Sequence, residues 1–232
     1  MKRTAILIIS SLLFGCATVT KPVPLDPKFW QNKDQTIGVA VTKSEPPTAY
    51  MLGNQGLLDI VINRANASQL IDHLAKLKLP KLEAIANDFI TQLKARGFNV
   101  KLIEQAIDES KQAKFSGSSS ETVQYPKYDY RKYKADGFDR LLIVSVDRVG
   151  TTRNYYGFLP TSAPQADFAL RGQLVNLDTN ELLWYTNDTS HLPIADPWDQ
   201  PPSFENVTAA VNTNVDQGIE KMEQSFFSGP VQ

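Results

Sequence analysis

This sequence is poor in the residues that enzymes and metal proteins most often use for chemistry. It has one cysteine, Cys16, and two histidines, His73 and His191, in 232 residues. A single cysteine excludes an internal disulfide and a metal site built on paired cysteines. The chain also lacks the serine-hydrolase, zinc-protease and phosphate-loop signatures. We therefore expect no cofactor and no bound metal.

An excess of positive charge is missing as well. The 24 lysines and arginines stand against 25 aspartates and glutamates, which gives a formal net charge of -1. Binding to the nucleic-acid backbone depends on clustered positive charge, so we expect no nucleic-acid partner. After residue 14 no apolar run is long enough to span a bilayer. A chain of this length suits one domain with a single sizeable core.

The longest apolar run lies near the start of the chain. Two basic residues precede the apolar stretch 5–14, and Gly15-Cys16 follows it. This arrangement is typical of a secretory signal peptide, here residues 1–15. The junction resembles the bacterial lipoprotein box, which implies that cleavage leaves Cys16 as the new N-terminus, carrying acyl chains such as palmitate. An ordinary cleaved signal or a buried cysteine is the alternative.

Acylation of Cys16 would hold the mature protein on a membrane, because each buried methylene contributes about 0.8 kcal/mol and several chains anchor durably. Ala17 stands where an aspartate tends to retain enteric lipoproteins in the inner membrane. By the same resemblance it implies the outer membrane, with the protein facing the periplasm. Residues 16–35 hold three prolines and little periodicity, so we expect a lipidated tether there. Residues 36–232 then form a single periplasmic α/β domain.

The rest of the chain mixes strand and helix patterns. Runs rich in apolar and β-branched residues predict strands at 36–42, 98–104, 140–146, 166–177 and 182–186. Helical spacing predicts helices that begin at Ser68, Pro80 and Ser203, and a short helix over 128–135. Segments 50–56 and 111–124 are predicted to be a turn and a mobile surface loop.

One apolar run leaves its structure open. Residues 57–63 fit either a helix or a buried strand, and we favour helix. Leu142 and Val144 in a central strand, and Val211 and Val215 on the last helix, are predicted to be core residues. The order of elements predicts an α/β (α+β) fold, in which helices pack on a single mixed β-sheet.

Two short motifs carry a resemblance to a known group. The turn Ala135-Asp136-Gly137-Phe138-Asp139 leads into an apolar strand, and a hairpin turn at 178–181 is followed by Trp184. These motifs are similar to those of envelope lipoproteins related to CsgG, LpoB and the N-terminal domain of TolB. Here Asn180 and Glu181 replace the usual glycine of that hairpin. The resemblance implies a TolB-N-terminal-like fold and a role in the envelope.

The segment 150–161 is the strongest candidate for binding. It follows a strand and carries Arg153, Tyr155 and Tyr156 between two glycines, with Phe158 directly after the second. Arginine and aromatic side chains are enriched at the centres of protein interfaces. We therefore predict that these four residues contact a partner, which we expect to be an envelope protein. The alternative is an edge hairpin whose aromatic residues cover the core.

An enzymatic alternative rests on residues 188–191. Asp188, Ser190 and His191 offer an acid, a nucleophile and a base, but close neighbours seldom converge as a catalytic triad must. The aromatic and basic stretch 125–134 fits packing better than nucleic-acid binding. The leading hypothesis is a non-catalytic binding or assembly module in the periplasm. An envelope hydrolase and a small-ligand carrier are the alternatives.

Overall fold

The computed structural model describes residues 20–228. The predicted signal peptide and the predicted lipidation site, Cys16, lie outside the described residues. The described helices are η1 Pro27–Gln31, α1 Leu57–Asn66, α2 Ser68–Leu74, α3 Pro80–Ala95, η2 Glu109–Lys111, η3 Arg131–Asp136 and α4 Glu205–Phe227. The strands are β1 Thr36–Val41, β2 Thr48–Asn54, β3 Asn99–Leu102, β4 Arg140–Tyr156, β5 Leu159–Pro160, β6 Gln165–Asn176 and β7 Leu182–Pro193. None of these helices has the length and hydropathy that a bilayer crossing requires.

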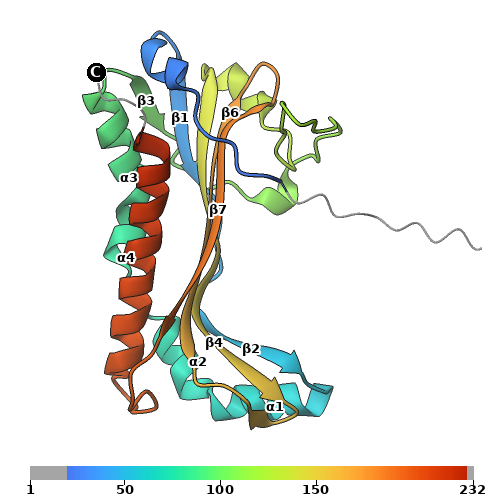
Figure 1. Ribbon diagram of the computed structural model, residues 1–232, viewed down its shortest axis with the longest axis vertical. Coiled ribbons are helices and arrows are strands. Elements are labelled where there is room, and N and C mark those ends of the chain that lie inside the picture. The colour runs from blue at the N-terminus through green and yellow to red at the C-terminus, as the bar shows by residue number, and fades with distance from the viewer. Residues whose placement is uncertain (1–19, 229–232) are drawn as a thin grey trace, which may run out of the picture.

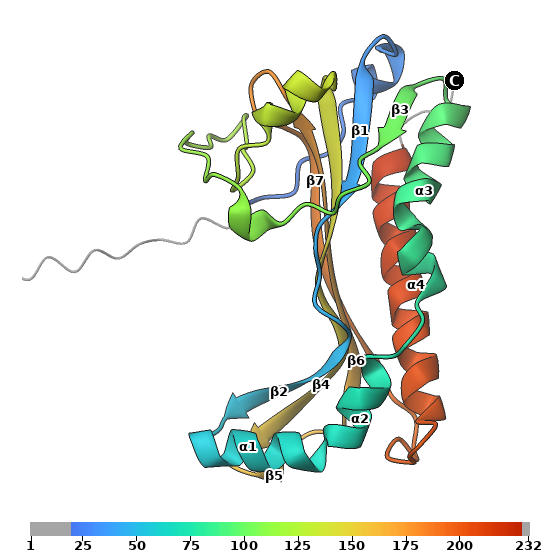
Figure 2. The ribbon, with the colours of Figure 1, turned by 180° about the vertical axis from the view of Figure 1, so that it is seen from behind.

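The strands form one seven-stranded mixed sheet (Figure 1). Its order is β3-β1-β4-β6-β7, with parallel pairing from β3 to β4 and antiparallel pairing from β4 to β7. Strands β2 and β5 pair with the far end of β4. Helices α3 and α4 lie on one side of the sheet (Figures 1 and 2). The structure therefore confirms the predicted fold class, a mixed sheet with helices packed on it.

The main core lies between the sheet and helices α3 and α4. The ring centroid of Phe226 lies 4.8 Å from that of Trp184 and 5.4 Å from that of Phe89, both edge to face. Leu142 is 0% exposed and Val144 is 1% exposed, which confirms both as core residues. Val211 and Val215 of α4 are confirmed as core residues, and Val207, Ile219, Met222 and Phe226 are buried along the same helix.

A second, smaller core lies on the opposite face of the sheet, where the segment before β4 covers it. Tyr130 is fully buried there, and its backbone N–H donates to Asn180 Oδ1 at 3.0 Å. The Asn180 amide in turn donates to the carbonyl of Tyr128 at 3.1 Å. Asn180 has a φ of 63°, a left-handed conformation that asparagine tolerates better than most residues. The predicted hairpin turn is therefore confirmed, and its asparagine also holds the covering segment.

Strand β4 bends at its middle. Its pairing with β6 shifts register between Val146 and Arg148, and Gly150 has a φ of 138°. A Cβ at Gly150 would collide with the carbonyl oxygen of Thr48, so the close approach of β2 to β4 where their pairing begins requires glycine. Before the bend β4 pairs with β1, and after it β4 pairs with β2. The far end of the sheet therefore turns away from α3 and α4 (Figure 2).

Two strand predictions were too short, and one turn prediction was wrong. Segment 50–56 is mostly strand β2, because its backbone pairs with the bent end of β4. Strands predicted to end at residues 146 and 186 continue to Tyr156 and Pro193. Their outer halves are more polar, which weakened the apolar signal on which the predictions depended.

The helix predictions were more accurate, apart from their starts. Residues 57–63 are helical, as favoured, and Pro80 opens α3. Ser203 does not cap the last helix, because Phe204 occupies the cap position with a φ of 44°. Ser68 is the first residue of α2, and no side-chain hydrogen bond caps that helix. The short helix near 128–135 is the 3-10 helix η3.

Candidate functional site

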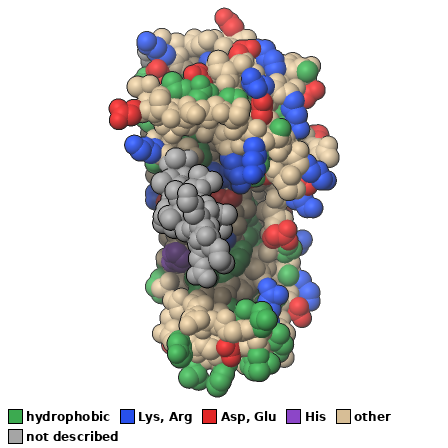
Figure 3. All heavy atoms as spheres, turned by 90° about the vertical axis from the view of Figure 1, so that its right-hand side faces the viewer, with side chains coloured by type: hydrophobic (Ala, Val, Ile, Leu, Met, Phe, Trp, Pro, Cys, Tyr) green, Lys and Arg blue, Asp and Glu red, His purple; other side chains and the backbone are tan. Residues whose placement is uncertain are grey.

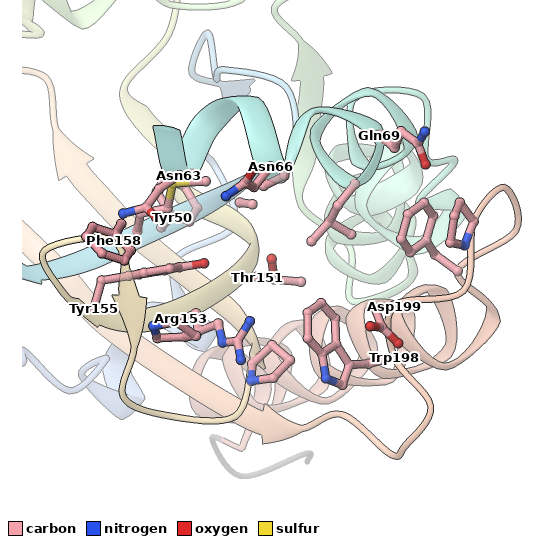
Figure 4. A pocket seen from close by; sticks show the side chains of 18 residues that line it. Tyr50, Asn63, Asn66, Gln69, Thr151, Arg153, Tyr155, Phe158, Trp198 and Asp199 are labelled. Carbon is pink, nitrogen blue, oxygen red and sulfur yellow. The ribbon is translucent and has the colours of Figure 1, made fainter. Parts of the chain in front are cut away.

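The bend in β4 creates a separate region at one end of the molecule, which we call the distal lobe. It consists of β2, β5, residues 150–156 of β4, and helices α1 and α2. A cleft of about 380 Å³, the distal cleft, lies between this lobe and the loop 194–204 that leads into α4. The side chains that line it include Met51, Asn63, Arg153, Tyr155, Phe158 and Trp198 (Figure 4).

Arg153 is held in place at one side of the distal cleft. It lies on β4 opposite Met51 of β2, and its Nε donates to the carbonyl oxygen of Ser162 at 2.9 Å. Its guanidinium carbon lies 4.8 Å from the ring centroid of Trp198 and 5.9 Å from that of Tyr155. Arginine stacks well on aromatic faces. Because these contacts fix the planar group, little side-chain freedom is left to lose on binding.

The four predicted binding residues do not all share one surface. Arg153, Tyr155 and Phe158 line the distal cleft, whereas Tyr156 does not. Side chains alternate along a strand, so Tyr156 projects from the opposite face of β4 to Arg153 and Tyr155. Phe158 is 58% exposed and Tyr156 is 69% exposed. The alternative in which these two rings cover the core is therefore wrong, while partner binding stays a prediction.

A buried amide joins the two walls of the distal lobe. Asn63 is only 2% exposed, and its Nδ2 donates to Gln55 Oε1 at 2.8 Å and to the carbonyl oxygen of Gly157 at 3.0 Å. Gln55 donates in turn to the carbonyl oxygen of Met51 at 3.1 Å. These hydrogen bonds tie α1 to both β2 and the β4–β5 turn. They therefore fix the wall of the cleft that carries Phe158.

A second polar cluster lies near the bend of β4. Asp167 is 2% exposed and accepts a hydrogen bond from Arg148 Nε at 2.8 Å, while His191 Nε2 lies 3.3 Å from its other oxygen. The hydrogen bond to Asp167 raises the pKa of Arg148. Burial raises the pKa of the nearby Tyr50 hydroxyl. Because the carboxylate of Asp167 is engaged on both oxygens, this cluster joins strands β4, β6 and β7.

The residues of the hydrolase alternative lie on opposite faces of the sheet. Asp188 and Ser190 lie on the α4 side of β7, where Asp188 pairs with Lys221 at 2.8 Å. His191, the next residue along, lies on the other side with Asp167. The carboxylate, hydroxyl and imidazole of the three predicted residues cannot meet in this arrangement. The structure therefore does not bring this triad together.

A third polar network joins Arg171 to the second core through Tyr130. Arg171 donates to Glu109 at 3.0 Å and to Asp147 at 3.1 Å, and the Tyr130 hydroxyl donates to Glu109 at 3.1 Å. Burial, with the nearby Glu109 carboxylate, raises the pKa of Tyr130 far above its usual range. Hydrogen bonds and charge from Glu109 and Asp147 raise the pKa of Arg171 although burial opposes them. The members satisfy one another, so we assign the network a structural role.

Sequence reasoning missed most of the residues that line the distal cleft, among them Trp198 and Asn63. Trp198 lies in a proline-rich connection, and nothing in that composition indicates that its ring returns to Arg153. Asn63 had a signal, because an amide at the end of the largely apolar run 57–63 suggests a buried hydrogen bond. Within residues 20–228 no three metal-binding side chains gather as an ion site requires. The distal cleft offers a fixed cation, aromatic rings, amides and the carboxylate of Asp199, which are groups for binding.

Comparisons with known proteins give distant similarities in structure. No family model and no curated protein matches this sequence. Protein XCC0632 from Xanthomonas campestris is 12% identical, over 89% of this chain and 92% of that one, with a TM-score of 0.37. Lipoprotein GNA1162 from Neisseria meningitidis is 14% identical, over 81% and 99%, with a TM-score of 0.26. The LpoB C-terminal domain from Salmonella enterica is 13% identical, over 70% and 90%, with a TM-score of 0.23. These solved structures thus include a lipoprotein, but the similarity assigns no function to this chain.

Proposed function

We propose that this chain is an envelope lipoprotein, anchored through Cys16 in the outer membrane and facing the periplasm, that works as a non-catalytic binding module. Its partner is an envelope protein that presents a segment to the distal cleft. The observation that carries the proposal is the position of Arg153, stacked on Trp198 and hydrogen-bonded to Ser162 at the cleft wall. An arginine fixed among aromatic rings is a common anchor of protein interfaces.

Two features of the described residues support binding over catalysis. The acid, nucleophile and base of the hydrolase alternative lie on opposite faces of β7. The described side chains that line the distal cleft include a guanidinium, aromatic rings and amides, together with the Thr151 hydroxyl and the Asp199 carboxylate, and they include no cysteine, serine, histidine or lysine. The cleft volume of about 380 Å³ also falls in the range of small-ligand sites, so a carrier remains the competing function.

The partner is tested by photocrosslinking in living cells. A benzophenone amino acid at Phe158, on the rim of the cleft, should give a discrete protein adduct under ultraviolet light. The same amino acid at Thr91, an exposed position on α3, is the matched control and should give none. Adding Arg153→Ala to the protein that carries the benzophenone amino acid at position 158 should abolish the adduct. Losing such an anchor commonly costs about 2 kcal/mol of binding free energy or more.

Thermal melting must show that the Arg153→Ala protein is folded. An adduct that survives in the folded variant would remove Arg153 from the interface. The absence of any protein adduct at Phe158 would overturn the protein partner and favour the small-ligand carrier.

The anchor is tested separately, by Cys16→Ala. Without the thiol no diacylglycerol can be attached, so the variant should remain as an unprocessed or soluble precursor that takes up no labelled palmitate. Membrane fractionation and acyl labelling measure this. Persistent label in the outer-membrane fraction of the variant would contradict the lipoprotein assignment.

A further inference from the structure

Helix α1 is inverted relative to an ordinary surface helix. Its apolar residues face outward: Leu57 is 86% exposed, Leu58 is 72% exposed and Val61 is 64% exposed. Its one buried side chain is the amide of Asn63. A surface helix in water normally buries its apolar face and exposes its polar face. The outer face of α1 is therefore suited to contact with an apolar environment.

The apolar surface continues from α1 onto the neighbouring strands. Leu52 of β2 is 49% exposed, and Tyr156 and Leu159 beside the β4–β5 turn are 69% and 57% exposed. Figure 3 shows hydrophobic side chains gathered at the end of the molecule formed by the distal lobe. We call this surface the apolar tip; its residues are Leu52, Leu57, Leu58, Val61, Tyr156 and Leu159. Contiguous exposed apolar surface of this kind marks contact with another molecule or with a membrane.

The apolar tip is nearly free of charge. Between Tyr50 and Asn63 the one charged residue is Asp59, and between Asn154 and Ala166 there is none, although 21% of the whole chain is charged. The carboxylate of Asp59 accepts a hydrogen bond from the Gly56 N–H at 2.9 Å, so it is tied to the start of α1. The low charge favours contact with an apolar environment, such as the interior of a lipid bilayer.

Two side-chain amides and the β4–β5 turn behind the apolar tip find hydrogen-bond partners within the lobe. Gln55 donates to the carbonyl oxygens of Met51 and Leu52, and Asn63 donates to that of Gly157. The N–H of Gly157 donates to the carbonyl oxygen of Asn54 at 2.9 Å. Backbone that enters lipid must find its hydrogen bonds inside the protein, whereas a protein partner could supply them. This internal satisfaction favours lipid over a protein surface.

The membrane in which Cys16 would be anchored lies close enough for the apolar tip to touch it; this step rests on the proposed acylation of Cys16. Val23 is the point at which the described chain joins the body, because its N–H donates to the carbonyl of Tyr185 at 3.0 Å. The stretch from Cys16 to Val23 spans at most about 25 Å when fully extended. In Figures 1 and 2 the first described residues and α1 both lie on the side of the sheet opposite α3 and α4. One bilayer surface can therefore meet both.

We propose that the apolar tip inserts into the interfacial layer of the membrane in which Cys16 is anchored, so that α1 is a second membrane contact. Leucine and valine side chains of α1 enter the acyl boundary, and Tyr156 lies at headgroup level, where amphipathic rings are favoured. The two contacts together fix the tilt of the molecule on the bilayer. The tip projects from the end of the fold, as a surface that enters lipid must.

The test places a fluorophore on the apolar tip of the full lipidated protein. Because acylation consumes the Cys16 thiol, Val61→Cys carries the one free thiol of the mature chain and takes an NBD label there. Thr91→Cys on α3 is the matched control. In phosphatidylethanolamine–phosphatidylglycerol vesicles, the Val61 label should be blue-shifted and quenched severalfold more by doxyl-labelled lipid than the Thr91 label. Equal quenching at the two positions would overturn the proposal.

A second labelled variant tests whether α1 inserts into the membrane or the NBD label is itself drawn into lipid. Leu159→Cys, on the β4–β5 side of the tip, should also be quenched by doxyl lipid. Adding Leu57→Glu and Leu58→Glu should remove that quenching, because charged side chains resist entry into lipid. Quenching that persists would overturn insertion through α1.

Photocrosslinking distinguishes this inference from the proposed function. A benzophenone amino acid at Val61 should form adducts with lipid, and a discrete adduct with a protein or a second copy of the chain would overturn the inference. The Phe158 adduct and the Cys16 fractionation test the proposed function by themselves. Failure of one proposal therefore leaves a different result from failure of the other.

Discussion

Helices α4 and α1 both carry many apolar side chains but meet opposite surroundings. Val211 and Val215 of α4 are each 1% exposed, because the helix packs on strands β4, β6 and β7. Leu57 and Leu58 of α1 are 86% and 72% exposed, because only the narrow end of β2 and β4 lies behind them and Asn63 occupies the inner side. An apolar stripe thus shows which face seeks an apolar contact. It does not show whether the protein itself supplies that contact.

The two halves of β4 differ in the same way. Residues 141–145 are buried on both faces of the sheet, whereas past the bend Asn154 and Tyr156 are exposed. The body before the bend therefore contains most of the packing that stabilises the fold. The distal lobe after the bend has less buried surface and more surface left for contacts.

The largest expected effect compares one substitution at both ends of the molecule. Leu142→Ala removes a fully buried side chain from the body and should lower the free energy of unfolding by about 2 to 5 kcal/mol. Leu58→Ala, in the apolar tip, should change it by no more than about 0.5 kcal/mol, since the side chain is already in water. Urea denaturation of the unlipidated chain measures both. Similar losses at the two sites would break the distinction between body and lobe.

A smaller effect is expected at the amide that joins the lobe. Asn63→Ala leaves the carbonyl of Gly157 and the amide oxygen of Gln55 without their donor, which should cost about 1 to 3 kcal/mol. Asn66→Ala, three residues along the same helix and exposed, is the matched control and should be near neutral.

Hydrogen exchange locates the loss caused by Asn63→Ala. Amides of β2 should exchange faster in this variant, while those of α4 should change little, because the two regions share few contacts. Equal acceleration in both regions would mean that the lobe and the body unfold as one unit.

Most of the body follows from local sequence patterns, and the bend does not. Successive apolar residues at 141–144 indicate a strand buried on both faces, and the spacing in α4 indicates the helix that covers it. The distal lobe depends on the pairing of β2 with the far half of β4, a contact between distant segments that leaves no local period. Gly150 makes the close approach of β2 to β4 possible, but a glycine in a strand equally suits a bulge.

The candidate site was predictable in part for the same reason. The residue types of 150–161 point to contact, so Arg153, Tyr155 and Phe158 could be proposed from composition. Because β4 continues to Tyr156, the alternation of side chains places Tyr156 on the opposite face of the strand to Arg153 and Tyr155, away from the cleft. Trp198 comes from a loop some 40 residues later in the chain, about which periodicity says nothing.

The smallest expected effect tests the turn that starts β4 in the body. The N–H of Thr36 at 2.8 Å, and then the Lys134 ammonium at 2.9 Å, hold the pKa of the Asp139 carboxyl below its usual range. A depressed pKa stabilises the fold above the ordinary value of about 4, and this stability is lost as the pH falls through the folded value. Asp139→Asn keeps an oxygen for the Thr36 N–H but removes the charge, so the loss at pH 7 should stay below about 1 kcal/mol at this partly exposed site.

The difference between wild type and Asp139→Asn should therefore be constant above about pH 5 and should shrink below about pH 4. Thermal melts across that range measure it. Asp178→Asn, which removes a second charge from Lys134 and leaves the Thr36 hydrogen bond intact, is the matched control and should cost less at pH 7. A difference that does not change with pH would mean that the carboxylate charge plays no part. The turn would then be held by the hydrogen bond from the Thr36 N–H alone, without help from charge, as the distal lobe is held by the uncharged amide of Asn63.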